Sequence, residues 1–84
     1  MESDRVIAAT IDSLLAARAA SASICPSEVA RELSPEGDSW RPLMPEVRRV
    51  AAALAGEGRL LVTRGGLEVD AMSKGGPIRL RRPR

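Results

Sequence analysis

The chain of 84 residues contains no histidine, one cysteine (Cys25) and one lysine (Lys74). These scarcities remove the usual ligand sets for zinc, haem and iron–sulfur centres, and they exclude an internal disulfide. Cys25 has no histidine to act as its base, and Lys74 lies in a glycine-flanked loop, a poor setting for a desolvated amine. We therefore expect no enzymatic activity, no metal and no cofactor, and we interpret Cys25 as a small structural residue beside a helix start.

Aromatic residues and long apolar runs are also scarce. Trp40 is the single tryptophan, and Phe and Tyr are absent, so the core must be built from aliphatic side chains and methionine. A chain of this length predicts one small domain over residues 1–84. No run approaches the roughly 18 apolar residues of a membrane span, and the acidic start is not typical of a secretory signal. We expect a cytoplasmic protein with no membrane partner.

The net charge of +2 hides an uneven distribution. Residues 74–84 carry five basic and no acidic residues, which gives +5, so residues 1–73 come to −3. A basic end favours contact with nucleic acid, but it can also dock an acidic protein partner or keep the chain soluble.

Two helices are predicted in the first half of the chain. Apolar residues at helical spacing predict a core-facing helix over residues 3–18. A brief strand at Ser23-Ile24 leads into a second helix, Pro26–Leu33, in which proline occupies the first helical position. The carboxylate of Glu28 is expected to reach back to the backbone N–H of Cys25.

A third helix is predicted within Ser39–Gly56. Pro42 and Pro45 leave its start open, either as an irregular first turn after Arg41 or as a regular helix from Pro45. Its apolar face consists of Leu43, Met44, Val47, Val50, Ala51 and Leu54. The opposite face gathers Arg41, Arg48, Arg49 and Ala52, a basic and short-chained front that suits close approach to an anionic surface. An ordinary solvated helix face would also carry such charges.

The last third of the chain predicts strands. Arg59–Thr63 meets Gly65-Gly66, which favours a tight two-residue hairpin turn into Leu67–Asp70. Residues 71–77 are expected to form a flexible loop. Ile78–Leu80 alternates apolar and basic residues and is expected to pair with one of the other two strands, while the basic end over about 79–84 is expected to fray.

This order of elements predicts an α+β winged helix-turn-helix with three helices and a small antiparallel sheet. In that arrangement the third helix enters the major groove of DNA, and the hairpin with its following loop runs along the backbone or minor groove. The connection between the second and third helices, about seven residues, is longer than the usual three or four.

The middle of the chain, SEVARELSPEG followed by VRRVAAALAGEGRLLVTRGG, resembles winged-helix regulators. More narrowly, the motifs ICPSEVAR (Ile24–Arg31), Trp40-Arg41 with Leu43-Met44, Val47-Arg48 and GPIRL (Gly76–Leu80) resemble a family of small bacterial domains of unknown function, over about residues 5–82. The resemblance implies a winged-helix-like fold, and the family has no established activity to carry over.

The functional prediction is a non-catalytic DNA-binding module, and transcriptional regulation is the role expected for it. Groove or phosphate contacts are expected from Arg41, Arg48 and Arg49, and wing or backbone contacts from Arg64, Lys74, Arg79 and Arg81. Two alternatives stay open: a protein-interaction module that docks an acidic partner or a second copy, and an RNA-binding module in which Trp40 or the arginines stack on unpaired bases. Because one winged helix covers about half a regulatory site, sequence-specific control is expected to need either a dimer or a neighbouring protein. Trp40 is otherwise interpreted as a core residue.

Overall fold

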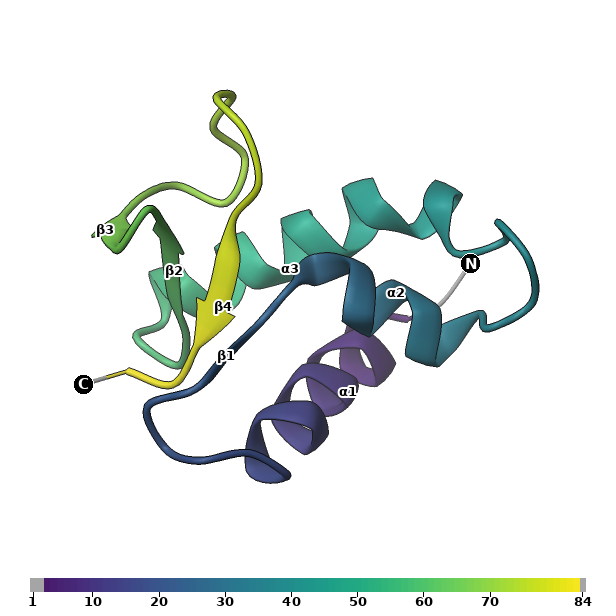
Figure 1. Ribbon diagram of the computed structural model, residues 1–84, viewed down its shortest axis with the longest axis horizontal. Coiled ribbons are helices and arrows are strands. Elements are labelled where there is room, and N and C mark those ends of the chain that lie inside the picture. The colour runs from purple at the N-terminus through teal and green to yellow at the C-terminus, as the bar shows by residue number, and fades with distance from the viewer. Residues whose placement is uncertain (1–2, 84) are drawn as a thin grey trace.

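The computed structural model describes residues 3–83 and confirms three helices with a small antiparallel sheet, a winged-helix-like α+β fold (Figure 1). The helices are α1 (Asp4–Ala16), α2 (Pro26–Leu33) and α3 (Met44–Gly56), and a 3₁₀ turn, η1 (Arg41–Leu43), runs directly into α3. The sheet lies beside the helices at one end of the molecule. Among residues 3–83, no helix is both long and apolar enough to cross a membrane.

The helix starts follow from local chemistry. The Ser3 hydroxyl accepts a hydrogen bond of 3.2 Å from the backbone N–H of Val6 and so caps α1. At the start of α2, the backbone N–H of Cys25 donates to the Glu28 carboxylate at 2.7 Å, as the sequence predicts. Of the two starts predicted for the third helix, the structure has the irregular first turn after Arg41: the 3₁₀ turn η1 precedes the regular helix α3.

The sheet has the strand order β1-β4-β2-β3 and is antiparallel throughout. Its strands are β1 (Ser23–Ile24), β2 (Leu61–Arg64), β3 (Leu67–Glu68) and β4 (Arg79–Arg81). Compared with the predicted strands Arg59–Thr63 and Leu67–Asp70, β2 begins two residues later and β3 ends two residues earlier. One further ladder bond, from the Val69 N–H to the Val62 carbonyl at 2.9 Å, continues the hairpin beyond β3.

The position of β4 confirms one expectation and corrects another. It pairs with β2, as predicted for one of the two hairpin strands, and it also pairs with β1, so it lies inside the sheet. The predicted fraying is not seen as far as Arg82, because Arg79–Arg81 form the strand and Arg82 donates a 2.7 Å hydrogen bond to the Leu15 carbonyl near the end of α1. The Ile78 and Leu80 side chains are buried and Arg79 is exposed, as the alternation predicts.

The chain between β2 and β4 forms the wing, residues 65–78. It begins with Gly65 and Gly66 at φ +58° and +85°, a pair of left-handed conformations that a two-residue hairpin turn requires and that glycine adopts without strain. After β3 the chain forms the wing loop, residues 72–76, within a connection that stands clear of the sheet in Figure 1. The wing loop is therefore a projecting feature beside α3.

The core is aliphatic and joins all three helices to the sheet. Trp40 is half-buried and packs against this core from the connection between α2 and η1. The largest fully buried side chains are Ile7, Ile11, Ile24, Val29, Val47, Val62, Ile78 and Leu80.

Candidate nucleic-acid interface

An open groove of about 520 Å³ lies between the N-terminal half of α3 and the wing loop. The helix contributes Met44, Pro45 and Arg48, and the opposite wall is formed by residues 72–76 of the wing. Its two charged residues are Arg48 and Lys74, one from each wall. The fold thus brings together two of the cations that the sequence assigns to the helix and to the wing.

Within residues 3–83, neither of these two cationic groups takes part in an ion pair or a side-chain hydrogen bond. Six side-chain ion pairs occur among residues 3–83, and none of them involves the Arg48 guanidinium or the Lys74 ammonium. Arg48 is half-buried and Lys74 is exposed. Both charges are therefore available to an anionic ligand that enters the groove.

Arg64, at the end of β2, organises the wing loop from within. Its guanidinium donates five hydrogen bonds of 3.1–3.3 Å, to the carbonyl oxygens of Ser73, Lys74 and Gly76 and to the Ser73 hydroxyl. Gly75 has φ +131°, and a Cβ atom there would lie 3.3 Å from a guanidinium nitrogen of Arg64. Arg64 therefore holds the loop that presents Lys74, and the loop is not the unconstrained segment that its glycines predict. Sequence reasoning missed this role.

Arg49 does not line the groove and instead reaches the start of α1. Its guanidinium forms hydrogen bonds of 2.6 and 3.0 Å to the Asp4 carboxylate at the start of α1 and one of 2.6 Å to Glu46. The hydrogen bond from Arg49 lowers the pKa of Asp4, and the two carboxylates raise the pKa of Arg49 further above its ordinary value. Arg49 therefore does not share the open front predicted for it with Arg48.

Arg79 and Arg81, in β4, do not line the groove. Arg79 reaches across to β1, where it donates to the Ser23 hydroxyl at 2.9 Å, to the Ser23 carbonyl at 3.0 Å and to Cys25 Sγ at 2.6 Å. Arg81 is half-buried, and its Nε has no hydrogen-bond partner among residues 3–83. The Arg79 bonds therefore tie β4 to β1 and to the residue that precedes α2.

Arg41 lies on the Trp40 side chain at the entry to α3. Its guanidinium carbon is 4.7 Å from the centroid of the indole ring, and that of Arg31 is 4.4 Å from the same centroid. Arg41 also pairs with Asp38 at 3.4 Å, but both side chains are highly exposed. Trp40 thus combines core packing with two cation–π contacts, which leaves little of its ring for a stacked base.

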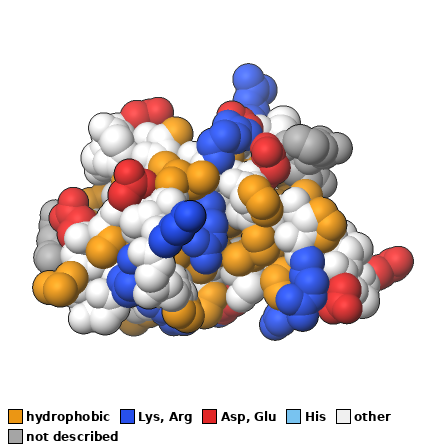
Figure 2. All heavy atoms as spheres, turned by 90° about the horizontal axis from the view of Figure 1, so that it is seen from above, with side chains coloured by type: hydrophobic (Ala, Val, Ile, Leu, Met, Phe, Trp, Pro, Cys, Tyr) orange, Lys and Arg blue, Asp and Glu red, His pale blue; other side chains and the backbone are white. Residues whose placement is uncertain are grey.

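The C-terminal half of α3 faces the wing across a second hollow, of about 450 Å³. Small residues of the helix, Ala52, Ala55 and Gly56, form one wall, and residues 68–71 form the other. The charged residues in this half are Glu68 and Asp70. We call the groove and this second hollow, which follow one another along α3, the two halves of the channel: the N-terminal half is basic and the C-terminal half is acidic. Figure 2, seen from the wing side, shows blue basic side chains separated by orange hydrophobic ones, with red acidic ones also on this face.

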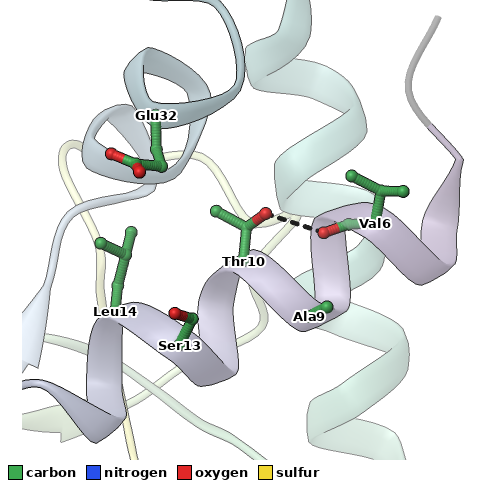
Figure 3. A pocket seen from close by; sticks show the side chains of 6 residues that line it. All are labelled: Val6, Ala9, Thr10, Ser13, Leu14 and Glu32. Atoms are coloured by element: carbon green, nitrogen blue, oxygen red, sulfur yellow. Dashed lines mark hydrogen bonds between the residues drawn. The ribbon is translucent and has the colours of Figure 1, made fainter.

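A third hollow, of about 260 Å³, lies between α1 and α2 (Figure 3). It is lined by Val6, Ala9, Thr10, Ser13 and Leu14 of α1 and by Glu32 of α2, and the Thr10 hydroxyl is already bonded to the Val6 carbonyl at 2.8 Å. One carboxylate without a second titratable group offers no acid–base pair. Across residues 3–83, no three His, Cys, Asp or Glu side chains gather as a possible metal site.

One comparison with known proteins supports the predicted resemblance to a small domain of unknown function. Comparison with curated proteins found no match. A family described as "Protein of unknown function (DUF3253)" matches residues 4–83, which include all three helices, the sheet and the groove. Because the match covers nearly the whole sequence, the chain belongs to this family, DUF3253.

Proposed function

We propose that the protein is a non-catalytic DNA-binding module that contacts a duplex with the N-terminal half of α3 and with the wing loop. The observation that carries this proposal is the placement of Arg48 and Lys74 on the two walls of one groove, with neither engaged in an ion pair among residues 3–83. Two such cations can neutralise phosphates without first breaking an internal ion pair.

The placement along the helix fits duplex DNA. Recognition helices of this fold class contact bases through their N-terminal residues, and Arg48 lies in the first half of α3. Arg41 precedes it by seven residues, which is about two helical turns, and so extends the basic surface toward the helix start. The Arg41–Asp38 pair is exposed and contributes little, so Arg41 can exchange Asp38 for a phosphate. Arg49, Arg79 and Arg81 are excluded from the proposed contacts, and Arg64 acts as a support for the wing loop.

A second candidate function, docking of an acidic protein segment, is favoured by the methionines of the groove. Met72 is 54% exposed, and Met44 lies on the facing wall. Methionine is common on adaptable protein-binding surfaces because its side chain is flexible and polarizable. The RNA alternative draws less support, because the Trp40 ring that would stack on a base already contacts Arg31 and Arg41.

The test is fluorescence anisotropy of labelled duplex DNA, and in parallel of single-stranded RNA, over a salt series. We expect duplex binding whose log–log salt slope falls by about 1.8 in the Arg48→Gln/Lys74→Gln variant, since each phosphate contact contributes about 0.9. The matched control, Arg5→Gln/Arg59→Gln, removes two exposed arginines outside the groove and should leave the slope near that of the wild type.

Absence of duplex binding at low salt would refute the DNA proposal. Equal salt slopes in the two double variants would show that the groove is not the surface that contacts the duplex. Tighter binding of single-stranded RNA than of duplex would favour the RNA reading.

A further inference from the structure

The two halves of the channel between α3 and the wing carry opposite and equal charge. The N-terminal half holds Arg48 and Lys74, and the C-terminal half holds Glu68 and Asp70. Along α3 the lining residues run from Met44 to Gly56, about 18 Å at 1.5 Å per residue. A surface with one basic and one acidic end is complementary to a copy of itself turned by a two-fold rotation.

The shapes of the two halves are also complementary. The wing loop projects from the molecule, as Figure 1 shows, and it carries Met72 and Lys74. The acidic half of the channel is walled by the short side chains of Ala52, Ala55 and Ala71 and by Gly56. The projecting loop carries a long apolar and a long basic side chain. It is therefore complementary to an acidic hollow whose short wall side chains leave room for them.

Exposed apolar surface on the wing supports association there. Among residues 3–83, the large hydrophobic side chains that remain exposed are Val6, Leu67 and Met72, at 42%, 72% and 54%. Two of the three belong to the wing, and Leu67 is next to Glu68. Burial of these side chains adds a hydrophobic contribution to the charge pairing.

We propose that two copies of this chain associate face to face about a two-fold axis, with the wing loop of each in the acidic half of the other's channel. Arg48 and Lys74 of one copy then lie against Glu68 and Asp70 of its partner, twice in the dimer. This association does not depend on DNA binding. Its consequence for regulation rests on the proposed function: the dimer covers the groove, so self-association and duplex binding exclude one another.

Sedimentation velocity of the protein alone tests the association. The wild type is expected to shift from monomer to dimer with rising concentration at low salt, and the dimer is expected to weaken with added salt. The Glu68→Lys/Asp70→Asn variant makes both ends basic, and the Arg48→Glu/Lys74→Gln variant makes both ends acidic. Each should lower the association constant at least about tenfold. Asparagine at position 70 retains an oxygen for the 2.8 Å bond from the Met72 N–H.

Mixing the two variants tests most directly whether the two ends pair with each other. In the mixed pair each basic end again meets an acidic end, so a heterodimer should form although neither variant dimerises alone. The control Glu32→Lys/Glu36→Gln changes the net charge as the first variant does, but at exposed residues outside the channel, and should dimerise like the wild type.

A wild type that stays monomeric at all concentrations, a mixture that stays monomeric, or a control that weakens the dimer as much as the first variant would each overturn the proposal. Because these samples contain no DNA, failure here is distinct from failure of duplex binding. If both proposals hold, Glu68→Lys/Asp70→Asn binds duplex more tightly than the wild type.

Discussion

Arg48 and Arg49 are neighbours in the sequence, yet they belong to two different regions of the molecule. The side of α3 that faces α1 is closed by ion pairs, with Arg49 held between Asp4 and Glu46. The side that faces the wing is open. There Arg48 and Lys74 lie on opposite walls of the groove, and neither side chain forms an ion pair among residues 3–83. The difference shows that the number of arginines on a helix does not measure its capacity for an anionic ligand. What counts is how many of them the fold has already paired.

The largest expected effect comes from exchanging each of the two arginines separately. Arg48→Gln should lower duplex affinity about tenfold at moderate salt, because a phosphate or base contact of an arginine contributes roughly that much. Arg49→Gln should change it less than about twofold, because this guanidinium already neutralises carboxylates. Anisotropy titrations of the two single variants compare them under identical conditions. Similar losses in both variants would contradict the division between the two sides of α3.

An intermediate effect is expected from Arg64, which supports the open side without lining the groove. Arg64→Met removes the five hydrogen bonds to the wing loop, so the free energy of unfolding should fall by about 1 to 2 kcal/mol. Amide hydrogen exchange at residues 73–76 should accelerate in the free protein, and Arg64→Lys should not restore the slow exchange, because an ammonium cannot donate in the same fork.

Duplex affinity distinguishes a supporting from a contacting Arg64. If Arg64 acts by holding Lys74 in place, Arg64→Met should lower affinity a fewfold in the wild type and little further in the Lys74→Gln background. Full additivity of the two losses would instead indicate that Arg64 contacts the nucleic acid itself.

The smallest expected effect is on acid stability, and it arises on the closed side. Arg49 lowers the pKa of Asp4 in the folded protein, whereas the unfolded chain has the ordinary value of about 3.9. The folded state then binds fewer protons, so the stability from this pair is complete above the unfolded pKa and is lost as pH falls through the folded one. Glu28, whose pKa is lowered by Arg18 and by the Cys25 N–H, contributes with the same sign.

Urea unfolding between neutral pH and about pH 3 measures the stability that this ion pair contributes. Arg49→Gln should flatten the acid decline of the midpoint slightly, because an exposed pair contributes little. Arg48→Gln should leave the decline unchanged, and a flattening in Arg48→Gln as large as in Arg49→Gln would count against the assignment.

Features determined by nearby residues were predictable from the sequence. The spacing of Ile7, Ile11 and Leu15 on α1, the bond from Cys25 to Glu28 and the turn at Gly65-Gly66 each depend on residues within a few positions of one another. The place of β4 between β1 and β2 depends on pairing with residues more than 15 positions away, and strand patterns do not encode a partner. Hence the strands were anticipated and their order was not.

The candidate site was predictable only in part for the same reason. Its position on the third helix and wing follows from the order of elements, and Arg48 and Lys74 lie there. The occupation of Arg49 depends on Asp4, 45 residues earlier, and that of Arg79 on Ser23, 56 residues earlier. A local signal for Arg64 was Gly75, whose missing side chain lets the backbone approach the guanidinium closely. Without knowledge of these tertiary contacts, arginines that are bonded within the protein could not be distinguished from those that are available to a ligand.

The most direct measurement is a chemical-shift map of the labelled protein titrated with duplex DNA at low salt. We expect the amide signals of Met44, of residues 46–48 and of residues 72–76 to shift most, while those of the start of α1 near Asp4 and of the hollow between α1 and α2 stay unchanged. Shifts centred on α1, or no shifts at all, would contradict the claim that the open side of α3 is the nucleic-acid interface.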